Sequence, residues 1–166
     1  MPEIVDVVDE WNDIIGCAPR EVVDEHKQCH RIVHVLVFNK NGEMALQIRS
    51  KTKSFAPGYF STSVGGYVLA GESYEEAAIR EAAEELSLEL SAENFVLVGD
   101  DHYVDDINNC MFIRTFRVEP HDGPFVVDEE EVESVVFKSV GEIHELTKGE
   151  GKFHPELKYI LEKYYK

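Results

Sequence analysis

The sequence has few basic residues and no long apolar run. Its 166 residues include 33 acidic and 16 basic side chains, which gives a formal net charge of −17. Non-specific binding to a nucleic-acid polymer requires Lys and Arg to neutralise phosphates, so we expect no such partner. No apolar stretch approaches the roughly 20 residues that cross a bilayer, so we expect no membrane association. Most of the acidity is expected to serve solubility.

Cysteine and tryptophan are also scarce. Cys17, Cys29 and Cys110 are scattered, with no CxxC pair and no disulfide framework, which favours a reducing compartment. The segment MPEIVDVVDEW has neither the basic region nor the apolar core of a signal peptide, so we expect a cytoplasmic protein. The single tryptophan, Trp11, is expected either to pack the N-terminal hairpin or to contact a second copy in a homodimer.

Length and patterning predict one domain covering residues 1–166. Strand and turn signals predict an N-terminal hairpin at about 4–17 and a second hairpin that joins 30–38 to 44–49 through Asn39-Lys40-Asn41-Gly42. Further strands are predicted at 60–64, 95–103, 109–118 and 133–138, and helices at 19–28, 140–148 and 155–165. Strands and helices do not alternate regularly, so the pattern predicts an α+β fold.

Residues 66–88, GYVLAGESYEEAAIREAAEELSL, predict one more helix and carry the main chemical signal. Ser73 is a suitable N-cap, and Glu76 completes a capping box. Ala77 and Ala78 are expected to leave room for a metal ion and an anion. At 100° per residue, one side of the helix is acidic and the opposite side, which should pack on a sheet, is apolar. The acidic side carries Glu81, Glu84 and Glu85, and the apolar side carries Ile79, Ala82, Ala83 and Leu86.

Three glutamates on one helix face suit a divalent cation. Mg²⁺ and similar hard cations take oxygen ligands and commonly bridge to substrate phosphates, so we expect Mg²⁺ or Mn²⁺ here. Such an ion offsets phosphate charge and activates an attacking water. We expect Arg80 to orient the carboxylates by ion pairing. The alternative for any acidic helix is an ordinary solvated face.

At these residues the chain resembles the Nudix hydrolase family. The family signature is matched by Gly66, Glu72, Arg80, Glu81, Glu84, Glu85 and Leu88, whereas Ala82 is small for its position. Ser87 replaces a glycine that would end the helix in a left-handed conformation, which should cost about 1 kcal/mol or force a different cap. The resemblance implies an α/β/α sandwich around a mixed β-sheet and hydrolysis of a diphosphate linkage in a nucleoside-diphosphate-linked or related small molecule.

The resemblance also implies roles for individual residues. Glu81, Glu84 and Glu85 would bind the metal, with Glu81 and Glu84 also catalytic, and Gly66, Glu72 and Arg80 would have structural or orienting roles. The general base varies in this family between a signature glutamate and an acidic residue on a later loop. Within the acidic run 128–131, Glu131 is the candidate, although such a run can also be a solvated turn. Arg49, Lys53 and Gly65 are the candidate substrate contacts, with a surface ion pair as the alternative for Arg49.

From about residue 5 to 88 the chain is also similar to the branch related to type I isopentenyl-diphosphate isomerase. There the isomerase cysteine falls on Gly65, its histidine on Tyr67 and its acid–base glutamate near Asn108. His30 matches one isomerase metal ligand, but its partner ligands are missing, and we expect His30 and His34 to be structural. Hydrolysis is therefore favoured. The alternatives are an isomerase-like enzyme and a non-catalytic binding module with the same fold.

Overall fold

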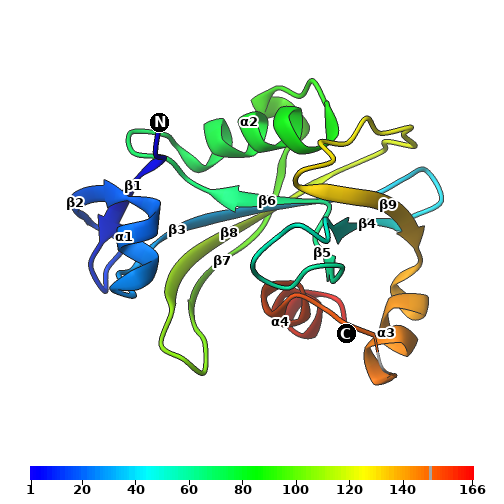
Figure 1. Cartoon of the computed structure of the whole chain (residues 1–166). Helices are drawn as coiled ribbons and strands as arrows, with labels where there is room; N and C mark the ends of the chain where they lie inside the picture. The colour runs from blue at the N-terminus through cyan, green and yellow to red at the C-terminus, as the bar shows by residue number, and fades with distance from the viewer. Residues whose placement is uncertain (150) are drawn as a thin grey trace.

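The computed structural model describes residues 1–149 and 151–166. Its elements follow one another as in Figure 1. They are β1 (Ile4–Val8), β2 (Ile14–Pro19), α1 (Arg20–Glu25), β3 (His30–Val37), β4 (Met44–Arg49), β5 (Phe60–Ser61), β6 (Val64–Tyr67), α2 (Tyr74–Leu86), a 3₁₀ turn (Ala92–Asn94), β7 (Val96–Val104), β8 (Cys110–Val118), β9 (Val132–Lys138), α3 (Val140–Lys148) and α4 (Pro155–Tyr164).

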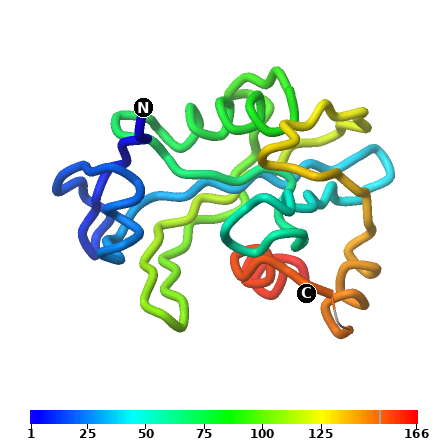
Figure 2. Tube along the Cα trace, viewed as in Figure 1, coloured from blue at the N-terminus to red at the C-terminus, as the bar shows by residue number. Residues whose placement is uncertain are grey.

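The strands form two larger sheets and a hairpin. The four-stranded sheet has the order β6-β3-β8-β7 and is mixed, because β3 runs parallel to β8 and antiparallel to β6. The other sheet, β5-β4-β9, is antiparallel, and β1 pairs with β2 alone. Helix α2 covers one side of the sheets and α4 the other, while the segment from β1 to α1 and helix α3 lie at opposite ends (Figures 1 and 2). The predicted α+β sandwich around a mixed sheet is therefore confirmed.

The predicted hairpin between 30–38 and 44–49 is wrong. Both strands exist, but they share only the isolated bridge between Phe38 and Met44. Strand β3 already pairs with β6 along one edge and with β8 along the other, so no edge remains for β4. The turn at Asn39 therefore sends the chain into the second sheet, where β4 pairs with β5 and β9.

Two apolar cores lie on the two faces of β3, as the period-two alternation of a strand requires. Val33, Val35 and Val37 face a core shared with α2. Leu36, with the following Phe38, packs into a core shared with α3 and α4. No helix in the described part of the chain is long and apolar enough to cross a membrane.

Helix α2 begins as predicted but packs differently. Ser73 accepts a hydrogen bond from the Glu76 N–H, and the Glu76 carboxylate accepts one from the Ser73 N–H, which confirms the capping box. The expected apolar side is partly wrong, since Ala83 is exposed and Ile79 only half-buried. The fully buried residues are Ala77, Ala78, Ala82 and Leu86, so the two early alanines fill the core instead of making room for an anion.

The glutamates share that buried stripe. Residues four apart follow one another along a helix face, so Ala77, Glu81 and Glu85 form a row next to the core row. Glu81 and Glu85 are accordingly buried, whereas Glu84 is exposed. At the other end, Ser87 adopts the left-handed conformation (φ 54°, ψ 34°), so the helix keeps the glycine-type cap with a serine in it.

The expectation that the cysteines are unpaired is also wrong. Cys29 and Cys110 form a disulfide with a Cα–Cα distance of 4.5 Å, and only Cys17 is free and exposed. The two cysteines are 81 residues apart in the sequence, where no spacing signal links them. They meet because β3 and β8 run in parallel from His30 and Met111, the residues that follow them.

Candidate active site

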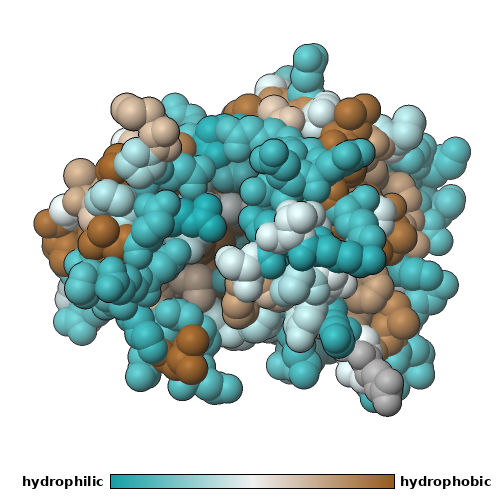
Figure 3. Space-filling model, viewed as in Figure 1, coloured by the Kyte–Doolittle hydropathy of each residue, from teal (hydrophilic) through white to brown (hydrophobic). Residues whose placement is uncertain are grey.

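A cavity of about 480 Å³ opens between α2, strands β3 and β6, and the start of α4. Figure 3 shows hydrophilic residues around a hollow near the centre of this face. Most of the predicted site residues line the cavity: Arg49, Lys53, Gly65, Gly66, Glu81, Glu84, Glu85 and Glu131. Glu72 and Arg80 are outside the lining, but Arg80 donates to the lining carboxylates of Glu81 and Glu84 and also to Glu72. One site thus collects residues from four separate stretches of the chain, namely β4 with the loop after it, β6, α2 and the loop before β9.

The two glycines of β6 allow side chains to pack directly against the strand. A Cβ atom on Gly66 would lie 2.2 Å from Glu81 Oε1, and one on Gly65 would lie 2.8 Å from His34 Nδ1. The backbone N–H of Gly65 donates a hydrogen bond of 2.9 Å to Glu85 Oε1. The glycines are therefore required by side chains on both faces of the strand, and Gly65 also fixes a carboxylate through its backbone.

Arg80 ties the acidic helix to the loop before it. Its guanidinium donates to both oxygens of Glu72 at 2.7 and 3.0 Å, to Glu81 at 2.8 Å and to Glu84 at 3.3 Å. It also donates to the Tyr67 carbonyl at 2.9 Å. Burial opposes ionisation of Glu72, but Arg80 and the Leu69 N–H outweigh it and lower the pKa of this carboxyl. These contacts support the predicted orienting role of Arg80 and Glu72.

Glu81 and Glu85 are two acids that the fold takes out of water. Burial raises the pKa of Glu81 to about 7, with Arg80 opposing the rise. Burial, together with the nearby Glu81, raises the pKa of Glu85 to about 8. Glu85 Oε1 accepts from Gly65, and its Oε2 accepts from Gln47 Nε2 at 2.8 Å. Each oxygen retains a free lone pair.

This donor set fits a divalent cation. The carboxylates of Glu81, Glu84 and Glu85 are hard oxygen ligands, and burial of the first two favours any cation that keeps them ionised. In the described chain their oxygens do not gather around one point, because Arg80 holds those of Glu81 and Glu84. Binding an ion would exchange part of the Arg80 contact for metal ligation.

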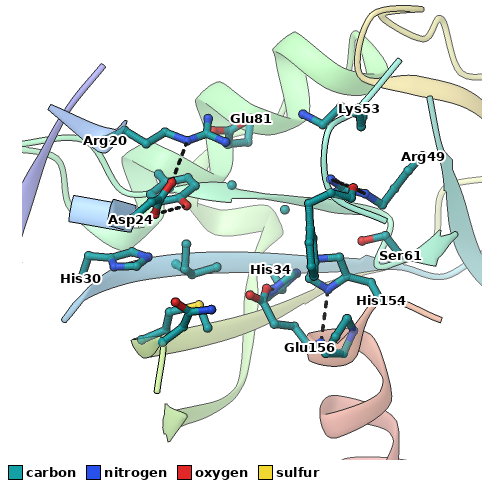
Figure 4. A pocket seen from close by; sticks show the side chains of 18 of the residues that line it. Arg20, Asp24, His30, His34, Arg49, Lys53, Ser61, Glu81, His154 and Glu156 are labelled. Atoms are coloured by element: carbon teal, nitrogen blue, oxygen red, sulfur yellow. Dashed lines mark hydrogen bonds and ion pairs between the residues drawn. The ribbon is translucent and has the colours of Figure 1, made fainter. Parts of the chain in front are cut away.

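The opposite wall of the cavity carries an imidazole–carboxylate pair made by the buried His34 and the half-buried Glu156 (Figure 4). His34 Nε2 lies 2.5 Å from Glu156 Oε2, and His34 Nδ1 lies 2.6 Å from Thr62 Oγ1. Thr62 donates its own hydroxyl proton to the Val64 carbonyl, so His34 Nδ1 is the donor in the Thr62 contact. Burial opposes ionisation of Glu156, but His34 outweighs it and lowers the pKa of this carboxyl to about 2.

His154 adds a neutral donor to the same wall. Burial lowers the pKa of His154 to about 4, so the ring is uncharged at neutral pH. Its Nδ1 accepts a hydrogen bond of 3.2 Å from the Glu156 N–H at the start of α4. The ring proton therefore resides on Nε2, which makes this atom a hydrogen-bond donor.

The predicted substrate and base residues lie at the mouth of the cavity. Arg49 donates two hydrogen bonds, of 2.9 and 3.2 Å, to the Phe55 carbonyl. The partner of Arg49 is thus a backbone carbonyl and not the carboxylate of a surface ion pair, which was the alternative to substrate contact. Lys53 forms an ion pair with Glu131. The pair places a cation and a carboxylate side by side in the cavity lining.

The N-terminal segment supplies a further wall that was not predicted. Arg20 lies over the Tyr67 ring at 4.2 Å, and the Tyr67 hydroxyl donates to Asp24 at 2.8 Å. His30 stacks on Tyr67 with ring centroids 5.0 Å apart. The buried Nε2 of His30 has no hydrogen-bond partner among the described residues. Arg20, Glu156 and His154 lie far from the signature in sequence, and no local motif marks them.

Comparison with known proteins identifies the family. The NUDIX domain model matches residues 29–158, which is most of the chain. The chain belongs to the Nudix family. It is 36% identical over 141 residues to the Uncharacterized Nudix hydrolase YfcD of Escherichia coli K12, a match that covers 85% of this chain and 76% of that protein. Membership makes it a hydrolase of acid anhydrides in small phosphorus-containing molecules, and Nudix hydrolases generally use divalent metal ions.

Solved structures with this Nudix fold include more distant proteins. DR0079 from Deinococcus radiodurans superposes with a TM-score of 0.81 at 24% identity, covering 99% of this chain and 100% of that chain. The NUDIX domain of NrtR from Shewanella oneidensis, solved as a complex with ADP ribose, has a TM-score of 0.62 at 12% identity, covering 80% of this chain and 83% of that one. At these identities the likeness concerns the fold alone.

Proposed function

We propose that this Nudix protein hydrolyses a diphosphate linkage in a nucleoside-diphosphate-linked or related small molecule, with Mg²⁺ or Mn²⁺ bound by Glu81, Glu84 and Glu85. The observation that carries the proposal is the buried pair Glu81 and Glu85 in one cavity with the cations Arg49 and Lys53. Buried carboxylates suit the ion, and the cations suit the phosphates. The ion, when bound, offsets phosphate charge and lowers the pKa of a coordinated water.

The protein residues perform the remaining steps. Arg49 and Lys53 bind and orient the diphosphate, and the backbone at Gly65 and Gly66 permits its close approach. Glu131 takes the proton of the water that attacks phosphorus, and its ion pair with Lys53 holds it in the cavity lining. Glu81 is the second candidate base, because it lines the same cavity and is the signature glutamate beside Arg80.

The cavity also supports a preference in the rest of the substrate. Phe55 packs edge-on against His154 with ring centroids 5.4 Å apart, but it is 57% exposed and lines the cavity, so the exposed part of its ring is available to stack on a base or another planar group. Glu156 and the His154 Nε2–H supply an acceptor and a donor for hydroxyl or amino groups. A nucleotide diphosphate, with its base and ribose, matches both surfaces. The ADP ribose complex of NrtR makes that compound a suitable first member of a substrate screen.

The isomerase-like reading has less support. Gly65 and Tyr67 occupy the places of its acid–base cysteine and one histidine, and Asn108 lies in a turn with a positive φ of 65°. The orphan Nε2 of His30 is the one observation in its favour, because it is a buried acceptor in the cavity wall.

The test is a screen of nucleoside diphosphates, nucleotide sugars and ADP ribose with Mg²⁺ or Mn²⁺, beside an isopentenyl-diphosphate isomerisation assay followed by NMR. Hydrolysis should be abolished by EDTA and by Glu84→Gln, while Glu89→Gln, an exposed glutamate beyond the helix, should be unchanged. Reaction in ¹⁸O-labelled water should place the label on a phosphate product. Isomerisation without phosphate release would favour the second enzyme. No turnover, with no divalent-ion binding by calorimetry, would favour a binding module.

A further inference from the structure

A second cluster of ligand atoms lies outside the glutamate site. Sγ of Cys29, Sγ of Cys110 and a ring nitrogen of His102 all lie within 4.8 Å of one another. His102 Nε2 is 3.3 Å from Cys110 Sγ, and the His102 ring stacks on Phe112 with centroids 4.3 Å apart. Two sulfurs and one imidazole therefore meet at a fixed place on the sheet.

Strand register builds this cluster. Cys29 and Cys110 immediately precede the paired residues His30 and Met111 of the parallel strands β3 and β8. On the other side of β8, His102 of β7 pairs with Phe112 in the antiparallel register. His102 is thus the diagonal neighbour of Cys110, and the period of two puts both side chains on one face. The three residues come together through backbone pairing on both edges of β8.

The disulfide alone does not account for the imidazole. A disulfide sulfur is at most a weak acceptor, yet the Phe112 stack holds the His102 ring with Nε2 toward it. When the disulfide is reduced, the same three groups become two thiols and one imidazole, and the thiols bind a metal as thiolates. That donor set is typical of Zn²⁺, which binds three protein ligands and leaves a fourth position for water. Ligand atoms around tetrahedral zinc lie about 3.5–4 Å apart, so small side-chain rotations would suffice.

We propose that, in its dithiol form, the protein binds one Zn²⁺ through Cys29, Cys110 and His102, and that the disulfide is the metal-free form of this site. The donors are soft, whereas the glutamate site offers only oxygens, so the two sites select different ions. Cys110 also lines the active-site cavity, and so does His30, the neighbour of Cys29. The zinc site is therefore at the rim of the cavity.

Opening the site consumes two electrons. A water-soluble phosphine supplies them: phosphine, disulfide and water give phosphine oxide and two thiols, with oxygen and two protons taken from water. Zinc binding then releases both thiol protons as the thiolates coordinate. Formation of the disulfide passes two electrons to an oxidised small-molecule disulfide, which takes two protons from water and leaves as two thiols, and the zinc ion is released.

The experiment uses full-length protein carrying Cys17→Ser, which removes the exposed free thiol. After reduction and removal of the phosphine, Co²⁺ is titrated under nitrogen. One equivalent should produce thiolate-to-cobalt charge-transfer absorbance, Zn²⁺ should abolish it, and the oxidised protein should show none. Ions bound at the glutamates give no thiolate band, so Glu84→Gln should leave the signal unchanged.

The histidine is tested by His102→Ala, which keeps both cysteines, with His26→Ala as the exposed control. His102→Ala should weaken Zn²⁺ binding by at least about 10–100-fold, the loss seen for groups that merely support a ligand. If the reduced protein unfolds, Zn²⁺ should restore its circular dichroism. Absence of a thiolate band in folded reduced protein, failure of Zn²⁺ to refold it, or equal affinity in His102→Ala would overturn the proposal.

Discussion

Replacing Glu85 by Gln tests the electrostatic logic of the site most directly. Glu85 is 6% exposed, and among the described residues its carboxylate accepts only from the Gly65 N–H and the Gln47 amide. Burial raises its pKa to about 8, so in metal-free protein at pH 7 the folded state keeps it protonated. The unfolded chain, with an ordinary carboxyl pKa near 4.5, releases that proton.

The sign of the effect follows from this difference. Between pH 4.5 and 8 the folded state binds more protons at this carboxyl than the unfolded state, so raising the pH destabilises the wild type. Each pH unit removes about 1.4 kcal/mol, or about 3 kcal/mol by pH 7. A glutamine at position 85 does not titrate and so avoids this loss, but its amide forms a poorer hydrogen bond with the Gln47 amide, which costs about 1 kcal/mol. The variant should therefore be about 2 kcal/mol more stable at pH 7, which corresponds to about 4–8 °C in Tm.

The assay is denaturant unfolding in EDTA at pH 5, 6, 7 and 8. The two proteins should be nearly equal at pH 5 and diverge as the pH rises, while the exposed control Glu89→Gln should follow the wild type. With Mn²⁺ at 100 times its Kd the wild type should gain about 2.7 kcal/mol, and Glu85→Gln should gain little. A wild type that equals or exceeds the variant at pH 8 in EDTA would refute the reasoning.

Three further changes test other parts of the structure. Gly66→Ala would place a Cβ 2.2 Å from the Glu81 carboxylate, so the free energy of unfolding should fall by about 1–3 kcal/mol and the Mn²⁺ affinity measured by calorimetry should also fall. The control is Gly16→Ala, where nothing lies within 4 Å of the added Cβ, and an equal effect there would contradict this explanation. Ser87→Gly should relieve the left-handed conformation and raise Tm by about 2–4 °C in calorimetry; an unchanged Tm would argue against strain there. Glu156, with its pKa near 2, stabilises the fold above pH 4.5 and loses this effect as the pH falls toward 2. Glu156→Gln should therefore lower the free energy of unfolding at pH 7 by about 3 kcal/mol and weaken the loss of stability at acid pH, which circular dichroism can follow. A variant as stable as the wild type at pH 7 would exclude the ion pair.

Elements specified by local chemistry were predicted well. The capping box at Ser73 forms as expected, and the predicted strand 44–49 matches β4. The N-terminal hairpin and the last two helices also agree closely. Pairing was harder to predict, because the turn at Asn39 has hairpin residues while β3 has both edges occupied by β6 and β8. Edge occupancy depends on β8, which comes some 70 residues later in the chain.

The site was predictable only where its residues are close in sequence. The spacing on α2 places the three glutamates together, and their assigned roles remain predictions. Helical periodicity could not show that Glu81 and Glu85 sit on the same buried stripe as Ala77, since a carboxylate normally marks the solvent side. Glu156 lies on α4, the last helix, and contacts His34 on β3 across the cavity wall. Contacts between residues so far apart in the sequence produce no regular residue spacing from which they could be predicted.

The distribution of charge explains how a protein with a net charge of −17 can accept an anionic substrate. Arg20, Arg49 and Lys53 line the cavity and place positive charge in its wall. The buried acids are not simply negative, because burial raises the pKa of Glu85 to about 8 and that of Glu81 to about 7, so without a metal Glu85 is largely protonated and Glu81 partly protonated near neutral pH. A proton and a divalent cation therefore compete for the same oxygens. Either one reduces the negative potential that a diphosphate would meet, and of the two, only the cation also binds its phosphates.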